Sequence, residues 1–296
     1  MRITLKQLVI FKAIYTHGQI SKAAKALHLS IPAVSMALKE LEGSLGNRLF
    51  DRNANGLSIN DNGKVILPYA NDMLSKSLEL EQIFSESTTG VRGSLKIGSS
   101  KTVGNYVLSR KIPLFKKAFP LVEMKLLIDN SLAIESLVSE RELDIGFIDV
   151  KPTSKNLHTQ RWFSDRICIV TSPENSIVNQ PITAELLSEQ LWVLDQTHSM
   201  SHMRAIQLLK SAHVSVNQEL TMTSMGAIKR AIGTGIGVSI LPWLAVEEEV
   251  ERGDLSELVL PQWCHQRNYW IVTRDDDKQA DLVRKFVEFC ENEKPC

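Results

Sequence analysis

The segment that decides the fold is residues 21–52, which read SKAAKALHLSIPAVSMALKELEGSLGNRLFDR. Small residues at Ala23 and Ala24 allow two helices to approach closely, as a tight helix-turn-helix corner requires. After the turn His28-Leu29-Ser30, Ser30 is a good N-cap, and Pro32 follows in the first helical turn, where a missing N–H does no harm. The buried stripe of this helix is Val34, Leu38, Leu41 and Leu45. The segment therefore predicts a helix-turn-helix.

The preceding residues predict a first helix that packs on this unit. Thr4 with Gln7 three positions later is a capping-box pattern. His17-Gly18 predicts the end of that helix, and Ser21 is expected to cap the next one. The expected buried stripe of the first helix is Leu5, Leu8, Phe11 and Ile14. Three short helices are thus expected within the first 60 residues.

The outward residues of the third helix predict contact with DNA, because the second helix of the motif enters the major groove. Hydroxyls bond base edges or phosphates, apolar groups touch thymine methyls, and Lys39 and Arg52 suit phosphates. A three-helix interaction domain without a DNA role is the alternative. The residues assigned to DNA are Ser21, Ser30, Ile31, Pro32, Ala33, Ser35, Met36, Lys39 and Arg52.

Charge supports this assignment. The whole chain has a net charge of zero, but residues 1–64 hold nine Lys or Arg against four Asp or Glu, a net charge of +5. A small basic head on a mildly acidic body favours a polyanionic partner.

Composition excludes several classes of protein. The chain has 296 residues, 43% hydrophobic and 23% charged, which excludes disordered, collagen-like and disulfide-scaffold proteins. Four scattered cysteines predict a reducing compartment without a zinc site. We find no signal-peptide pattern, and the longest apolar stretch, Ile236–Val246, is interrupted by Pro242. A cytoplasmic protein without a membrane span is expected.

Residues from about 62 to 87 predict one long helix, with Asn60-Asp61 as its N-cap and Pro68 as a site of kinking. A long helix with one apolar stripe predicts pairing with a partner helix, and intramolecular packing is the alternative. Residues 88–93, TTGVRG, then indicate a hinge. The stripe is Val65, Leu67, Ala70, Met73 or Leu74, Leu78 and Ile83.

From Ser94 onward, short apolar strands alternate with helices, which predicts an open α/β sheet of two lobes. The expected strands are Leu95–Gly98, Val122–Ile128, Asp144–Ile148, Arg166–Thr171, Leu191–Leu194, Val238–Leu241 and Tyr269–Thr273. The expected helices lie near 105–118, 131–140, 183–188, 201–212, 224–233, 243–251 and 277–291.

Small polar residues follow several of these strands, where α/β sheets bind ligands against helix N-termini. Ordinary helix capping is the alternative at each position. Their recurrence favours a polar cleft for a small anion, such as an inorganic oxyanion or a short carboxylate. The candidate effector-binding residues are Ser99, Ser100, Lys101, Thr102, Asn130, Ser131, Asp149, Thr197, Ser199, His202, Thr223 and Ser224.

Other chemistry is poorly supported. Gly233-x-Gly235-x-Gly237 lacks the spacing and the strand-to-helix order of a dinucleotide fingerprint. His198 and His202 are four residues apart but lack further metal ligands, and the chain has no G-x-S-x-G elbow. We therefore expect no metal, no cofactor and no enzymatic activity.

The head resembles LysR-type transcriptional regulators over about 60 residues. The matching positions, in order and at fixed spacing, are Leu8–Phe11, Ser21–Leu27, Ser30–Ser35, Leu38–Glu42, Leu45-Gly46, Arg48–Arg52 and, as a wing strand with the start of a linker helix, Leu57–Gly63. The family often has polar or basic residues where this chain has Ile31 and Met36, and a second basic residue in the wing. The resemblance therefore implies DNA binding without implying the operator sequence.

The resemblance also implies the organisation of the chain. It implies a winged helix-turn-helix domain over 1–60, a dimerising linker helix over 61–88, a hinge over 89–93 and an effector-binding domain over 94–296. That domain would resemble periplasmic solute-binding proteins, with lobe I over about 94–162 plus 267–296 and lobe II over about 163–266. The two crossings would bound lobe II, the second falling near 262–268.

The family further implies a ligand-responsive homodimer or homotetramer that bends a partly palindromic promoter site in double-stranded DNA and contacts RNA polymerase. The rival hypothesis is a cytoplasmic small-molecule-binding or enzymatic α/β protein with an accessory helical domain.

Overall fold

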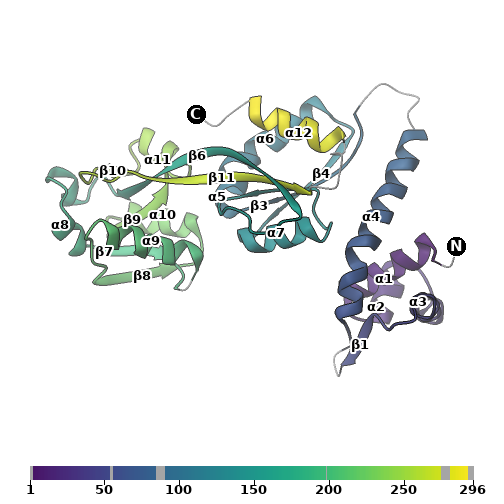
Figure 1. Cartoon of the computed structure of the whole chain (residues 1–296). Helices are drawn as coiled ribbons and strands as arrows, with labels where there is room; N and C mark the ends of the chain where they lie inside the picture. Colours follow the sequence, from purple (N-terminus) through teal and green to yellow (C-terminus); the bar gives the residue numbers. More distant parts are fainter. Residues whose placement is uncertain (1–2, 54–55, 85–90, 198, 275–280, 293–296) are drawn as a thin grey trace.

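The computed structural model describes residues 3–53, 56–84, 91–197, 199–274 and 281–292. A helical head is followed by a long helix and then by an α/β body of two lobes (Figure 1). Within the described residues, no helix is long and apolar enough to cross a membrane.

The head is the predicted three-helix unit with a two-stranded wing. Thr4 and Gln7 form the expected capping box, Gly18 ends the first helix at φ 64°, and the Ser30 hydroxyl accepts from the Ala33 N–H at 3.3 Å. The elements are α1 (Leu5–His17), α2 (Ile20–Ala26), α3 (Ile31–Leu45), β1 (Phe50–Asn53) and β2 (Gly56–Ile59). The predicted cap at Ser21 is wrong, because Gln19 is the N-cap and Ser21 lies inside α2.

The long helix α4 (Asp61–Phe84) begins where Asn60 Oδ1 accepts from the Gly63 N–H at 3.0 Å, and Pro68 lies inside it. The predicted stripe divides into two faces. Leu67 and Ala70 are buried in the core of the head, whereas Val65 and Met73 are exposed. The head therefore uses one face of α4 and leaves the other open. The side chains of Leu78 and Ile83, and hinge residues 88–90, lie outside the described residues.

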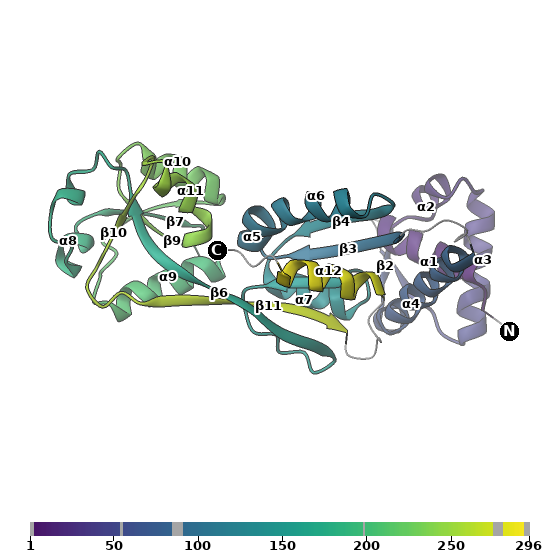
Figure 2. The ribbon, with the colours of Figure 1, turned by 90° about the horizontal axis from the view of Figure 1, so that it is seen from above.

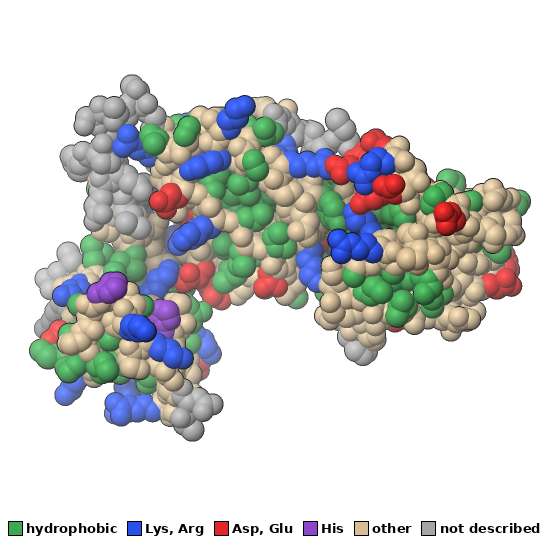
Figure 3. Space-filling view, turned by 180° about the vertical axis from the view of Figure 1, so that it is seen from behind, with side chains coloured by type: hydrophobic (Ala, Val, Ile, Leu, Met, Phe, Trp, Pro, Cys, Tyr) green, Lys and Arg blue, Asp and Glu red, His purple; other side chains and the backbone are tan. Residues whose placement is uncertain are grey.

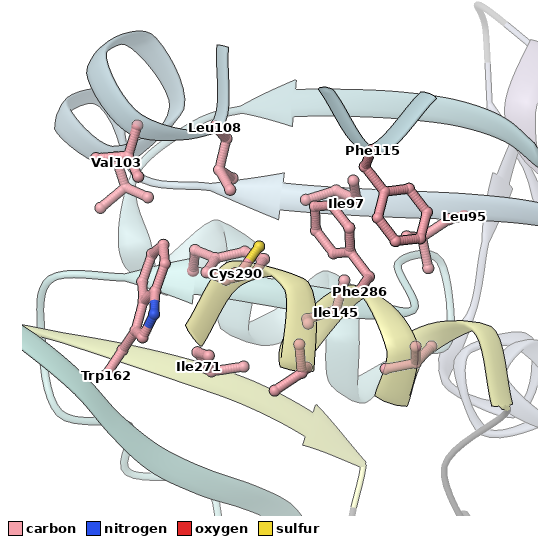
Figure 4. Packing of buried hydrophobic residues seen from close by; sticks show 14 of the residues in the cluster. Leu95, Ile97, Val103, Leu108, Phe115, Ile145, Trp162, Ile271, Phe286 and Cys290 are labelled. Carbon is pink, nitrogen blue, oxygen red and sulfur yellow. The ribbon is translucent and has the colours of Figure 1, made fainter. Parts of the chain in front are cut away.

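Lobe I contains three parallel strands with helices on both faces (Figure 2). Its elements are β3 (Gly93–Ser99), α5 (Lys101–Val103), the π-helical turn η1 (Gly104–Leu108), α6 (Ser109–Ala118), β4 (Val122–Ile128), α7 (Ser131–Ser139), β5 (Ile145–Ile148) and α12 (Asp281–Asn292). Phe115 and Phe286 meet edge to face with ring centroids 5.0 Å apart, which fixes α12 on α6 (Figure 4).

Lobe II has its own core around Trp192, which is fully buried. Its elements are η2 (Ser176–Asn179), α8 (Ala184–Ser188), β7 (Leu191–Asp195), α9 (Met200–Ser211), β8 (Gln218–Met222), α10 (Met225–Gly233), β9 (Val238–Pro242), η3 (Trp243–Ala245), α11 (Glu247–Glu251) and β10 (Ser256–Leu258). Strands β8 and β10 were not among the expected strands.

Two long antiparallel strands, β6 (Leu157–Thr171) and β11 (His265–Arg274), pass from one lobe to the other (Figure 1). They unite both lobes in one sheet of order β4-β3-β5-β11-β6-β9-β7-β8, with β10 on β6. Both strands are longer than the expected Arg166–Thr171 and Tyr269–Thr273. Asp165 faces Arg267 in register at the crossing.

The Asp165 carboxylate accepts the Leu244 N–H at 3.2 Å. Burial raises the pKa of Asp165 to about 6, despite the lowering effect of this hydrogen bond and of Arg166 and Arg267. The folded pKa therefore exceeds the unfolded value, so the folded protein binds more protons between the two. Stability contributed by this group is present at low pH and is lost as pH rises through about 6.

We predict that Asp165→Asn stabilises the effector-binding body relative to the wild type at pH 8 but much less at pH 4. The free energy of unfolding of the variant, relative to that of the wild type, should rise by up to about 3 kcal/mol between pH 4 and pH 8. Each unit of pKa shift is worth about 1.4 kcal/mol. Unfolding midpoints at several pH values measure it. A difference that does not change with pH would contradict the assignment.

Candidate functional site

The first candidate site is the outer face of α3 with the wing. All nine residues assigned to DNA are exposed, and Ile31 and Met36 are 53% and 65% exposed although both are apolar. Arg52 lies on β1, paired in register with Leu57. Figure 3 shows Lys, Arg and His side chains on this head. The fold thus presents the predicted residues together on the surface of one small domain.

Part of the positive charge of the head is paired with carboxylates within the protein. Lys12 donates to Asn71 at 2.6 Å and pairs with Glu142 of lobe I at 3.3 Å, while Lys64 pairs with Asp61. Lys39 and Arg52 are exposed and remain suited to phosphate contacts.

The second candidate site lies where β6 and β11 cross between the lobes. We call Ser100, Thr102, Ser131, Asp149, Arg204, Arg267 and Tyr269 the crossing cluster. Arg267 of β11 forms an ion pair with Asp149, whose carboxylate also accepts from the Ser131 hydroxyl at 2.6 Å. Both charged side chains are about one-tenth exposed. Such a pair is only weakly screened by solvent.

Arg204 brings a second positive charge from α9 of lobe II. Its guanidinium donates to the backbone carbonyl of Gln266, next to Arg267, at 3.2 Å. Burial, followed by the nearby charge of Arg267, lowers the pKa of Arg204. Two guanidiniums thus approach one another between the two lobes, with Asp149 paired to Arg267 and Asp165 opposite Arg267 in the strand register.

Ser100 contributes a buried hydroxyl to the lobe I side. It is 2% exposed, and its Oγ has no hydrogen-bond partner. Ser100 is the N-cap residue of α5, yet its side chain makes no capping bond. Its backbone N–H donates to Phe147 on β5 at 2.8 Å. Helix capping, the alternative considered for each hydroxyl, does not account for this one.

Thr102 and Tyr269 lie beside one another next to Ser100, and both are buried. Burial raises the pKa of Tyr269, so the phenol is neutral. The π-helical turn that follows Thr102 is a feature common at functional sites. Gly104 begins this turn and packs closely against Ile128, since a Cβ there would lie 2.7 Å from the Ile128 side chain.

Apart from Ser99, the other predicted effector residues make no side-chain hydrogen bond or ion pair to the crossing cluster in the described part of the chain. Asn130 and Ser199 cap helices through Ala133 and His202, and His202 pairs with Glu219 at 3.1 Å. Ser99 is buried and donates to the carbonyl of Ser100. The remaining four, all exposed, are Lys101, Thr197, Thr223 and Ser224.

Sequence reasoning missed Arg204, Arg267 and Tyr269. Arg267 falls inside the predicted second crossing, near 262–268, and that position could have marked it as a residue facing both lobes. His198 lies outside the described residues, and those described contain no group of three or more metal-ligating side chains.

Two family models match the chain. Residues 5–64 match the family model of bacterial regulatory helix-turn-helix proteins of the lysR family, and residues 88–294 match the LysR substrate binding domain. The chain is 31% identical to the uncharacterized HTH-type transcriptional regulator YeiE of Escherichia coli K12, over 98% of each protein. It is 25% identical to the RuBisCO operon transcriptional regulator of Allochromatium vinosum, over 98% of this chain and 96% of that one.

Solved structures show the same fold. A full-length OxyR variant from Pseudomonas aeruginosa superposes with a TM-score of 0.75 at 19% identity, covering 98% of this chain and 95% of that one. Full-length BenM superposes with a TM-score of 0.57 at 17% identity, covering 97% and 95%. The matched domains and relatives are regulators rather than enzymes. The chain belongs to the LysR family of transcriptional regulators, with a DNA-binding head and an effector-binding body.

Proposed function

We propose that this regulator binds a partly palindromic promoter site as a dimer or tetramer, and that a small anion bound at the crossing cluster changes DNA bending and transcription. The DNA part rests on the exposed face of α3 and on Arg52 in the wing. Two heads on one duplex would occupy half-sites one helical turn, or a multiple of it, apart.

The exposed side of α4 supports dimer formation. Val65, Tyr69, Met73 and Leu80 are between 52% and 65% exposed. The first three recur every four residues, so they lie along one face of the helix. A second copy of α4 is the matching apolar surface that would bury them.

The buried, unpartnered Ser100 hydroxyl is the observation that carries the effector assignment. A buried donor without a partner costs free energy, and a bound ligand would supply the missing bond. Arg204 and Arg267 bring two positive charges to the crossing cluster, which suit a small anion. Since lobe I supplies Ser100 and lobe II supplies Arg204, such a ligand would contact both lobes.

Contact with both lobes supports the regulatory step. A ligand shifts a conformational equilibrium only as far as its affinities for the two states differ. An anion held by Ser100 and Arg204 binds best when the lobes are close, so it favours that state. The shift between the two states would then alter the contact of the regulator with RNA polymerase, a contact that is known in its family.

The first prediction from the proposed function concerns DNA. Lys39→Ala and Arg52→Ala should each weaken binding on every duplex and flatten the dependence of log K on log salt by about one unit, because each removes one phosphate contact. Met36 substitutions should instead change base preference. Fluorescence anisotropy over a salt series measures both effects. Lys117→Ala, an exposed lysine of lobe I, is the matched control; an unchanged slope for Arg52→Ala would refute the placement of the wing.

The second prediction concerns the effector. A bound anion at 100 times its dissociation constant should add about 2.7 kcal/mol, raising the unfolding midpoint of the body by about 5–10 °C. Ser100→Ala and Arg204→Ala should abolish the shift, whereas Ser199→Ala, whose hydroxyl only caps α9, should keep it. The screen uses inorganic oxyanions and short carboxylates. A shift in the unfolding midpoint that only apolar compounds produce would refute the proposal that the ligand is an anion.

The third prediction concerns charge selection. Asp149→Asn removes the negative charge beside Arg267, so dianions should gain affinity relative to monoanions by about tenfold or more. Calorimetric titration with anions of similar size and different charge tests it at fixed pH. An unaltered preference would mean that Asp149 does not set the charge of the ligand. The anion-free unfolding midpoint of the variant checks that it still folds.

A further inference from the structure

The turn between α7 and β5 of lobe I lies against α1 and α4 (Figure 1). We call Lys12, Asn71, Asp72, Arg141 and Glu142 the head–lobe contact. Three of these residues belong to the head and α4, and two belong to lobe I. No part of the proposed DNA or effector chemistry uses them.

Asn71 is the centre of the head–lobe contact. It is 4% exposed, although it is polar and lies on a long helix. Its Oδ1 accepts from Lys12 Nζ at 2.6 Å, and its Nδ2 donates to the Glu140 carbonyl at 3.1 Å and to Glu142 Oε1 at 2.8 Å. Both ends of the amide are therefore bonded, one to the head and one to lobe I.

Two ion pairs flank this amide. Lys12 pairs with Glu142 at 3.3 Å, and Asp72 pairs with Arg141 at 3.1 Å. The four side chains are between 17% and 28% exposed. Arg141 adopts φ 61°, an unusual conformation for a residue other than glycine, and its guanidinium meets α4 from there. Burial, then the charges of Glu140 and Glu142, raises the pKa of the neighbouring Tyr15.

A contact made of hydrogen bonds and ion pairs differs from a hydrophobic core. Its groups are solvated again when the two surfaces separate, so it fixes orientation while opening at modest cost. We infer that Lys12, Asn71 and Glu142 are positioning residues that dock the DNA-binding head on lobe I of the same chain. The head then moves with lobe I as one body, and lobe II moves relative to both.

This docking does not depend on which effector binds, so it is tested in the free protein. Lys12→Glu and Glu142→Lys each place like charges around Asn71. The double variant restores opposite charges, and the Asn71 amide can turn over to serve them. Amide hydrogen exchange is read at Glu142, Leu143 and Asp144, whose N–H groups donate to Leu137 and Lys96 beneath the contact.

Each single variant should speed exchange at these three amides by about tenfold, equivalent to about 1.4 kcal/mol, and the double variant should restore slow exchange. Exchange in α3 should stay unchanged, which shows that the head is folded. Lys25→Glu, a charge reversal on the exposed side of α2, is the matched control and should leave the amides protected.

Arg141→Asn gives a second, independent measurement, because asparagine tolerates positive φ while removing the pair with Asp72. It should also speed exchange at Glu142 and Asp144. Unchanged exchange in both charge-reversal variants and in Arg141→Asn would overturn the docking, as would a double variant that exchanges as fast as the singles.

Discussion

The pairing of β6 with β11 is the constraint on which the rest of the body depends. These strands bond to each other from Leu157–Arg274 at one end to Ile167–His265 at the other, and the same β6 then pairs with β9. A strand shared by two lobes cannot slip by one residue without turning its buried side chains outward in both. The register therefore fixes which residues meet between the lobes, and it sets Asp165 opposite Arg267.

The crossing cluster follows from that register. Arg267 is brought to Asp149 by β11, and Arg204 reaches the same strand at the carbonyl of Gln266. The positive charges of Arg204 and Arg267 disfavour one another, and the carboxylates of Asp149 and Asp165 lie near them. A buried hydroxyl without a hydrogen-bond partner, such as that of Ser100, is costly in an isolated protein and is typical of ligand-binding positions.

Local patterns predicted the head well because its interactions are short-range. The Thr4 capping box and the Ser30 cap each join residues three apart, so the sequence shows them directly. The prediction at Ser21 failed because α2 begins at Ile20, and its N-cap residue, Gln19, makes no side-chain capping bond. The place of Arg267 in the predicted crossing could have marked it, but its meeting with Arg204 could not be predicted, since it depends on contact between α9 and β11, about 60 residues apart in the chain. Ordinary capping explained Asn130 and Ser199 but not Ser100.

Net charge alone also describes the head incompletely, because it does not show which charges are paired within the protein. Lys12 counts toward the net charge of +5 of residues 1–64, yet its ammonium lies between Asn71 and Glu142. A lysine bonded to a carboxylate offers little attraction to a phosphate, so the head facing DNA is less basic than its composition suggests. The charge of Lys12 instead helps to hold the head in a fixed orientation on lobe I. A domain that reads DNA through a few side chains of α3 gains from a fixed direction of approach, because each base contact requires a defined position in the groove.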